Sequence, residues 1–242
     1  MQRPLLLLLE LEQMAVLDQL QLEEALLRAD QRNICLINWG AAPAVVLGSS
    51  GQVADWVEPL AWERLPLPLI RRFSAGGTVV VDSSTLFITF IANGDQLQVE
   101  PFPKAIMEWT LPFYQPLFRT GSFCLRDNDY ALGDRKCGGN AQYISRKRWL
   151  HHTSFLWDWS ASHMELLKMP PRMPHWRQQR SHDQFLCRLI DWGVASPQAF
   201  FTGFKEQLSS HFSVEPLSLE EASSILSRPH RRTSCVLSSF PR

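Results

Sequence analysis

The sequence predicts an α+β fold in which a central mixed or antiparallel β-sheet is flanked by helices. Three features predict it: an amphipathic helical pattern near the N-terminus, two blocks of short β-rich runs, and a largely helical C-terminal third. Most connectors between the β-rich runs are too short for a crossover helix, which favours antiparallel pairing over a purely parallel sheet. With 242 residues, 45% of them hydrophobic, the chain is long enough to bury one sizeable core.

The chain opens on a leucine-rich run, residues 5–9, that imitates the apolar part of a secretory leader. Glu10, Glu12 and Asp18 interrupt this run before any small-residue cleavage site, so we interpret it as part of the mature chain. Over residues 11–29, leucine and valine recur at helical spacing among Glu, Gln and Asp. This pattern predicts an amphipathic helix that packs on the sheet.

Two blocks of short β-rich runs, separated by glycines and prolines, predict the strands of the sheet. The runs span residues 34–39, 44–47, 69–72, 78–81 and 86–91 in the first block, and 123–130, 140–144 and 149–157 in the second. Between the blocks, residues 100–118 have apolar residues at helical intervals but contain Pro103, Pro112 and Pro116. We therefore expect a broken helix there.

The chain beyond His163 is predicted to be helical over residues 183–192 and 197–212, after a proline-rich joint at 169–174. The last residues, 228–242, have little apolar periodicity. We expect one main domain over residues 1–215 and a loosely ordered C-terminal extension over 216–242.

Composition excludes several classes of protein. Basic and acidic residues both number 24, so no net positive field favours nonspecific binding to nucleic acid. No stretch approaches the roughly 20 apolar residues of a membrane-spanning helix, so we expect a soluble protein. The five cysteines are scattered without a CxxC pair, which favours neither a disulfide framework nor a four-thiolate zinc site. A reducing intracellular compartment fits best, with cytoplasm and organelle both left open.

The segment Arg71–Asp82 places two arginines at the end of one β-rich run, then Gly76-Gly77, then a second run. We interpret it as a hairpin with a positively charged mouth. Its glycines would allow close approach of a ligand and leave N–H groups free for an anion. The alternative is that the glycines only satisfy a turn and the arginines make surface ion pairs.

Two further segments contain residues that suit chemistry. Lys136 precedes the second glycine pair, Gly138-Gly139, where an ammonium group could hold a carboxylate and a phosphate together, although such a lysine is often only a solvated turn residue. On a strand, His151 and His152 point to opposite faces, so they cannot easily ligate one metal. One of them could instead face a pocket, or both could be structural.

In this order and at this spacing, the three segments resemble the superfamily of lipoate-protein ligase A, octanoyltransferases and biotin ligases. The resemblance is strongest to its lipoate-ligase-like branch, because the paired arginines and paired histidines fit biotin transfer less well. It covers about residues 14–190, and the whole chain is similar to plant and algal members. The matching residues are Arg71, Arg72, Ser74, Gly76, Gly77, Val79, Asp82, Asn128, Asp129, Lys136, Gly139, Ala141, His151, His152 and Leu156.

This resemblance implies a biotin/lipoate ligase-like catalytic domain with an acyl pocket between the glycine turn and the lysine loop. Lys136 would bind the acyl carbonyl and the phosphate, and Asp129 would lie near the nucleotide or its Mg²⁺, with no other metal site expected. The acyl-adenylate would be bound by Arg72, Ser74, Gly76, Gly77, Thr78, Asp129, Gly139, Ala141 and His152.

The function implied is that of a lipoate-protein ligase that uses ATP and Mg²⁺ to attach lipoate or octanoate, through an acyl-adenylate, to a lysine of a lipoyl domain. The acceptor would be the lipoyl domain of a 2-oxoacid dehydrogenase or the glycine-cleavage H protein, and the enzyme would be a monomer without a tightly bound cofactor.

Two alternatives stay open. An octanoyltransferase would take the acyl group from acyl carrier protein or another lipoyl domain, with Cys124, twelve residues before Lys136, as the covalent carrier. A noncatalytic member would only bind a lipoyl domain or an adenylate. Ala75 and Val81 keep this last alternative open, because they replace a glycine and a histidine of the family pattern.

Overall fold

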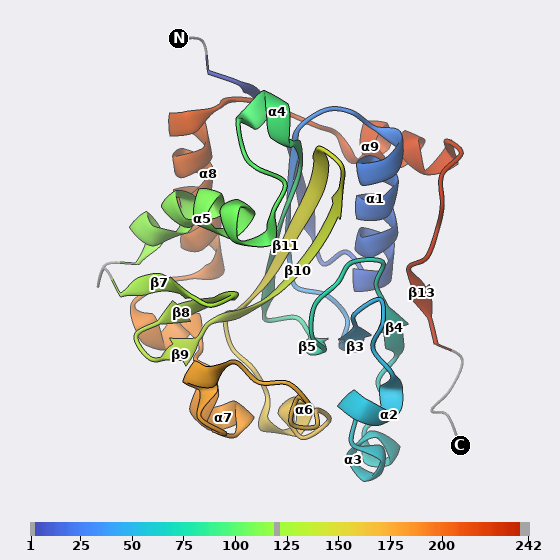
Figure 1. Ribbon diagram of the computed structural model, residues 1–242, viewed down its shortest axis with the longest axis vertical. Helices are drawn as coiled ribbons and strands as arrows, with labels where there is room; N and C mark the ends of the chain where they lie inside the picture. Colours follow the sequence, from blue (N-terminus) through green and yellow to red (C-terminus); the bar gives the residue numbers. More distant parts are fainter. Residues whose placement is uncertain (1–2, 119–121, 238–242) are drawn as a thin grey trace.

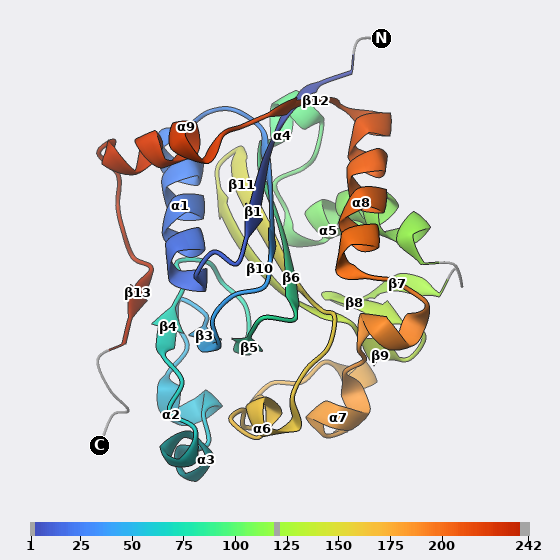
Figure 2. The same ribbon diagram turned by 180° about the vertical axis from the view of Figure 1, so that it is seen from behind.

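The computed structural model describes residues 3–118 and 122–237, and within them it shows a central six-stranded sheet with helices on both faces (Figures 1 and 2). Helix α1 (Val16–Ala29) covers one face. Helices α5 (Pro103–Tyr114) and α8 (Pro197–His211) cover the other. The α+β prediction is confirmed.

The central sheet has the strand order β10-β11-β6-β2-β1-β12. Strand β1 pairs in parallel with β2 and β12, and the other neighbours are antiparallel, so the sheet is mixed. Its strands are β1 (Leu5–Glu12), β2 (Ile34–Trp39), β6 (Thr85–Asn93), β10 (Gly138–Ser145), β11 (Arg148–Leu156) and β12 (Ser213–Pro216).

The leucine run at the start of the chain forms β1, an element that the sequence pattern did not predict. Residues 6–9 are all buried because helices cover both faces of the sheet, so the run lacks the alternation of a half-exposed strand. The predicted helix at residues 11–29 accordingly begins later, at Val16. Met1 and Gln2, which open the suspected leader, lie outside the described residues.

A second sheet has the order β13-β4-β3-β5, and it shows that the hairpin predicted for Arg71–Asp82 is wrong. Strand β3 lies between β4 and β5, parallel to one and antiparallel to the other. The intervening chain does not turn tightly, because Ala75 instead exchanges two backbone hydrogen bonds with Gln142 of the central sheet. The strands are β3 (Ala44–Leu47), β4 (Leu69–Arg71), β5 (Val79–Val81) and β13 (Cys235–Val236), and helices α2 (Val53–Trp56) and α3 (Pro59–Arg64) connect β3 to β4.

A small antiparallel sheet contains β7 (Phe123–Arg126), β8 (Asp129–Leu132) and β9 (Arg135–Lys136). The single strand predicted over residues 123–130 is therefore two strands. They separate at Asp127, which adopts a φ of 53° in the turn between them.

The helix that contains prolines is less broken than predicted. Pro103 occupies the first turn of α5, where its missing N–H costs nothing, and Pro112 lies inside the helix near its end. The 3₁₀ turn η1 (Gln115–Leu117) then ends the segment at Pro116. A short helix, α4 (Gly94–Leu97), precedes it.

Between β11 and α8 the chain forms only short helical segments. These are α6 (Ala161–Met164), η2 (His175–Arg177), α7 (His182–Phe185) and η3 (Leu189–Trp192). The helix predicted over residues 183–192 is therefore not continuous but is divided into two pieces, α7 and η3. By contrast, α8 agrees with the helix predicted over residues 197–212.

The C-terminal extension differs from the loose segment that we expected. Strand β12 crosses the expected boundary at residue 215, and α9 (Leu219–Ser224) and η4 (Ile225–Ser227) follow it. Their buried side chains Leu217, Ala222 and Ile225 join the apolar cluster beneath α1. Residues 216–237 are thus packed on the main body, and residues 238–242 lie outside the described part. None of the helices in the described residues is long and apolar enough to cross a membrane.

Candidate active site

A cleft of about 1350 Å³ lies where the second sheet, the small sheet and the segment between β11 and α8 meet the central sheet. Ligand pockets for small molecules usually enclose about 300–1,000 Å³, so this cleft has room for an extended ligand. Its walls include residues 76–80, the end of β7 with residues 127–129 and Lys136, and side chains from residues 164–186. Residues 138–140 of β10 and Ser154 of β11 also line it.

Residues 76–80 form one wall of the cleft, here called the glycine wall. Its conformation requires glycine at one position. Gly76 has a φ of 139°, and a Cβ there would meet Arg72 Nη2 at 2.5 Å and the Asn140 carbonyl at 2.7 Å. A Cβ on Gly77 would meet only the Trp56 ring, at 4.0 Å. Ala75, which replaces a glycine of the family pattern, does not have a positive φ, so its methyl group causes no backbone strain.

Arg72 lies beneath this wall and is 4% exposed. Its guanidinium donates hydrogen bonds to the carbonyls of Gly77 (2.6 Å) and Val46 (3.3 Å). Burial lowers the pKa of Arg72 to about 10, with Glu23 acting in the opposite direction, so the group stays charged at neutral pH. Within residues 3–118 and 122–237, the Nε of Arg72 and the Oγ1 of Thr78 are buried and have no hydrogen-bond partner, and Thr78 lines the cleft.

The opposite wall presents Lys136 and Cys124 on one face of the small sheet. Cys124 lies directly opposite Ala131, and Ala131 lies directly opposite Lys136, so the three side chains project on the same side. Asp129, two residues before Ala131, shares this face and forms an ion pair of 2.6 Å with Lys136 Nζ. All three of these functional groups line the cleft.

A small internal void of about 20 Å³ lies behind the glycine wall. Arg72, Ala141 and His152 line this void rather than the cleft, and Gly139 lines both. Ser74 lines neither: it is buried, and its carbonyl accepts a hydrogen bond from the Ser49 N–H. The structure therefore divides the predicted site residues between the cleft, the void and a structural position.

The paired histidines point to opposite faces of the sheet, as predicted. His152 Nδ1 lies 3.0 Å from Glu23 Oε1 on α1 and 3.0 Å from Thr89 Oγ1. His151 lies on the opposite face of the central sheet, where its Nε2 is 3.0 Å from the Tyr130 hydroxyl. Burial, with a smaller contribution from His152, lowers the pKa of His151 to about 3, so this imidazole is neutral.

The third wall of the cleft was not predicted from the sequence. Residues Lys168, Arg172, His175, Arg177 and His182 line it, and no acidic residue occurs between Glu165 and Asp183. This local excess of positive charge was the available signal, but the overall charge balance concealed it. Arg177 is 5% exposed and packs over the Phe185 ring. Burial lowers the pKa of Arg177, and the nearby Asp129 carboxylate opposes this shift.

These groups fit an anionic ligand with an apolar part. Cations from two walls face the cleft, and the buried Thr78 Oγ1 offers a further polar contact. Apolar surface comes from Leu125, Leu156, Met164, Leu167 and Phe185. Over residues 3–118 and 122–237, no group of three or more His, Cys, Asp or Glu side chains is arranged to hold a metal ion.

Val81 and Asp82 have structural contacts. Val81 packs in a separate apolar cluster with Val16 and Leu20 of α1. Asp82 accepts hydrogen bonds from the Ser84 N–H (2.9 Å) and hydroxyl (2.6 Å) and pairs with His163 at 2.9 Å. The five cysteines are unpaired.

The fold is similar to that of solved lipoate-protein ligases. A structure of lipoate-protein ligase A bound with ATP superposes with a TM-score of 0.71 over 93% of each chain, at 17% identity. A bipartite lipoate-protein ligase from Thermoplasma acidophilum, studied with its E2 lipoyl domain, superposes with a TM-score of 0.72 over 93% of this chain and 91% of that one, also at 17% identity.

Among curated proteins, the chain is 25% identical over 189 residues to the inactive lipoate-protein ligase 2 of Plasmodium falciparum (isolate 3D7). This match covers 64% of the present chain and 49% of the relative. The chain spans about half, or less, of the length of the curated relatives that it matches.

The family model for the lipoyl protein ligase A/B catalytic domain matches residues 15–212. This range contains α1, the glycine wall, Lys136 and both histidines, and thus all of the cleft described above. The chain therefore belongs to the family of lipoyl protein ligase A/B catalytic domains.

Proposed function

We propose that this protein is a lipoate-protein ligase that activates lipoate or octanoate with ATP and transfers the acyl group to a lysine of a lipoyl domain. The observation that carries the proposal is the convergence of Lys136, the Gly76-Gly77 segment and the cations of residues 168–182 on one cleft. Neighbours of the same fold include ligases bound with ATP and with lipoic acid, which supports both substrates.

Adenylate formation requires a carboxylate to attack the α-phosphate of ATP, and both groups are negatively charged. Lys136 is the cation on the small-sheet side of the cleft, and Asp129 orients its ammonium group. In a partly buried site, a fixed positive charge offsets this repulsion more strongly than it would in water. Lys136 would therefore contact the acyl carboxylate and the phosphate in the reaction.

The phosphates would lie toward Arg172, Arg177 and His182, which line the same cleft. Bound Mg²⁺ would neutralise phosphate charge, with Asp129 as the nearby carboxylate. The unpartnered Thr78 hydroxyl, next to Gly77, is a candidate donor to the adenylate.

The acyl chain would lie on the apolar wall of the cleft, against Leu125 and Leu156. The void beside His152, about 20 Å³, has room for little more than one water molecule and cannot hold an eight-carbon chain as it stands. Deeper insertion would require the contact between Arg72 and the Gly77 carbonyl to open.

The acceptor would be a lipoyl domain of a 2-oxoacid dehydrogenase or the glycine-cleavage H protein, whose lysine would attack the adenylate. The Thermoplasma acidophilum ligase studied with its E2 lipoyl domain supports this class of partner. We expect the ligase to act as a monomer.

The second candidate is an acyltransferase that takes the acyl group from acyl carrier protein or another lipoyl domain. The favouring observation is that Cys124 faces the cleft in the same cross-strand row as Lys136. In that reaction the Cys124 thiolate would form a thioester and release the donor thiol, and the acceptor lysine would then release Cys124.

One pair of assays separates the candidates. A ligase predicts exchange of labelled pyrophosphate into ATP that requires lipoate or octanoate. A transferase predicts no exchange, but a mass increase of one octanoyl group on Cys124 after incubation with octanoyl carrier protein. If the folded protein gives neither signal, it is a noncatalytic binder, as the name of the inactive Plasmodium relative suggests for that protein.

A further inference from the structure

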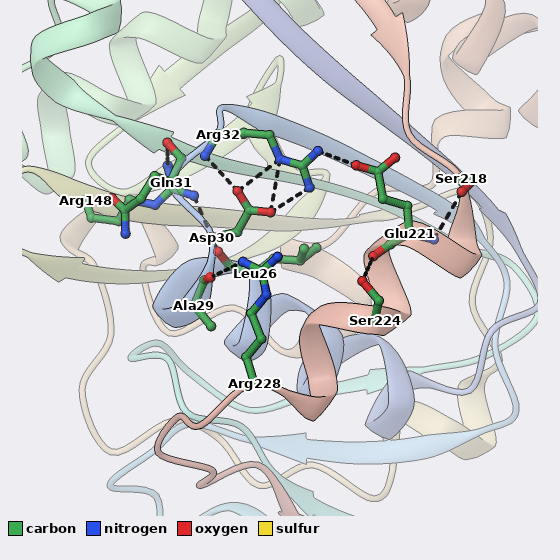
Figure 3. Close-up of polar contacts among 10 residues, drawn as sticks. All are labelled: Leu26, Ala29, Asp30, Gln31, Arg32, Arg148, Ser218, Glu221, Ser224 and Arg228. Carbon is green, nitrogen blue, oxygen red and sulfur yellow. Dashed lines mark hydrogen bonds and ion pairs between the residues drawn. The ribbon is translucent and has the colours of Figure 1, made fainter.

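The C-terminal residues 228–237, here called the strap, run beside α1 and pair with β4 through β13 (Figures 1 and 2). The strap begins at a polar cluster at the end of α1, drawn in Figure 3. There Arg228 donates a hydrogen bond of 3.1 Å to the Ala29 carbonyl, and Arg32 bridges Asp30 and Glu221. The Arg228 hydrogen bond joins the upper end of the strap to the end of α1.

The lower end of the strap is fixed by a buried carboxylate of α1. Glu24 is 1% exposed and accepts hydrogen bonds from the N–H groups of Thr233 (2.9 Å) and Ser234 (3.0 Å). It also accepts from the Thr233 hydroxyl (2.7 Å) and the Ser234 hydroxyl (3.1 Å). A carboxylate with this many donors is strongly held, so residues 233 and 234 have one defined position on α1.

The Ser234 hydroxyl has a second partner, which Thr233 lacks. While it donates to Glu24, it accepts a hydrogen bond of 3.3 Å from the Phe73 N–H. Phe73 lies between Arg72, which supports the glycine wall, and Ser74. The strap then continues as β13, which pairs Cys235 with Arg71 on β4.

Two adjacent glutamates of α1 thus contact two different segments that carry predicted site residues. Glu23 contacts His152 at the void, and Glu24 holds the hydroxyl that supports the Phe73 backbone. Because α1 is anchored on the sheet by its buried face, the strap connects β4, which ends one residue before Arg72, to a rigid support.

We propose that Ser234 is a positioning residue for the glycine wall of the cleft, whose hydroxyl fixes the backbone between Arg72 and Ser74 to Glu24 of α1. The proposal rests on the ligase function proposed above. Loss of the hydroxyl would leave the Phe73 N–H without its acceptor. The backbone of residues 72–74, which positions the Arg72 side chain against the Gly77 carbonyl, would then be more mobile.

The test compares Ser234→Ala with Thr233→Val in the full chain. Each substitution removes one hydroxyl that donates to Glu24, but only Ser234→Ala removes the acceptor for Phe73. Two quantities are measured for both variants and the unaltered protein: amide hydrogen exchange in peptides that cover residues 70–76, and the KM values for lipoate and ATP in adenylate formation.

Ser234→Ala should accelerate exchange in residues 70–76 and raise the KM for lipoate or ATP about 3- to 10-fold, the factor expected for one lost hydrogen bond. Thr233→Val should leave both quantities close to those of the unaltered protein. Equal hydrogen exchange in the two variants would overturn the proposal, and so would equal KM values in a protein that forms the adenylate.

Failure of the proposed function would look different. If the unaltered protein forms no adenylate, the ligase proposal fails, while the exchange comparison still decides whether Ser234 holds the Arg72 segment. If adenylate forms and Ser234→Ala exchanges like Thr233→Val, the positioning role fails and the ligase function stands.

Discussion

Lys136 is the residue on which the proposed chemistry depends, and its neighbour on β9 supplies a matched control. Lys136→Ala should reduce acyl transfer by about 100-fold or more, the range found when a charge-stabilising group is removed from an active site. The fold should persist, because Lys136 is partly exposed and its partner Asp129 can be hydrated from the cleft. Activity assays and thermal melting of the same sample check both expectations.

Arg135→Ala removes an exposed cation from the adjacent position, which does not line the cleft. It should retain acyl transfer. Comparable losses in the two variants would mean that general positive charge, rather than the Lys136 ammonium group, accounts for the effect.

His151 should make the stability of the protein fall in mild acid. Its folded-state pKa of about 3 lies below the ordinary value of 6.5, so the unfolded state binds the proton more readily as the pH falls. The stability from this group is complete above pH 6.5 and is lost below it, by about 2 kcal/mol at pH 5, since one pKa unit corresponds to about 1.4 kcal/mol.

Urea unfolding of the unaltered protein and His151→Gln at pH 7 and pH 5 tests this expectation. The amide of glutamine stays neutral and can bond to Tyr130, so the variant should show the smaller loss of stability between the two pH values. An identical loss in both proteins would contradict a buried neutral His151.

For single residues, the sequence predicted that Lys136, Asp129, Gly76, Gly77 and Cys124 belong to the site, because each lies in or near a short motif of consecutive residues. It missed Arg172 and Arg177, whose positions depend on how a proline-rich segment folds over the cleft. It also grouped Arg72 and His152 with the cleft, although tertiary packing places them at the void.

The glycine wall provides an element-scale prediction. Gly76→Ala should destabilise the protein by more than about 1 kcal/mol, since alanine at a positive φ is strained and its Cβ would meet Arg72 and the Asn140 carbonyl. Gly77→Ala, whose Cβ meets only the Trp56 ring, should keep the midpoint of thermal unfolding nearly unchanged. If the two variants melt at the same temperature, the strain assigned to position 76 is absent.

Most strands and the helices α1, α5 and α8 were predictable because their patterns are local. The predictions that failed for strands concern which strands pair with one another and whether a strand is present. Strand β1 lacks alternation because both of its faces are buried, and β4 and β5 look like a hairpin because nothing in their own residues reveals that β3 lies between them.

In the molecule as a whole, we expect the C-terminal residues to stabilise the main body through burial of their apolar side chains. Ile225→Ala should lower the free energy of unfolding by about 2–4 kcal/mol, because it opens a cavity in the cluster beneath α1. Glu221→Gln removes an exposed ion pair with Arg32 and should cost less than about 1 kcal/mol. Both free energies of unfolding can be measured by urea denaturation. Equally small losses of stability in the two variants would contradict this packing.

The family resemblance predicted the architecture of the whole molecule, but the composition of the last residues did not reveal their packing. Their few apolar side chains, such as Leu217 and Ile225, are too widely spaced for a clear period, and each is buried in a cluster that α1 and the central sheet complete rather than by its own element.

The most direct test of the central claim is the intact mass of an apo lipoyl domain after incubation with this protein, lipoate, ATP and Mg²⁺. The account predicts a mass increase of one lipoyl group that disappears when ATP is omitted or when Lys136→Ala replaces the unaltered protein. An unchanged mass with the complete mixture, from a protein shown to be folded, would contradict the claim that this cleft carries a lipoate-protein ligase activity.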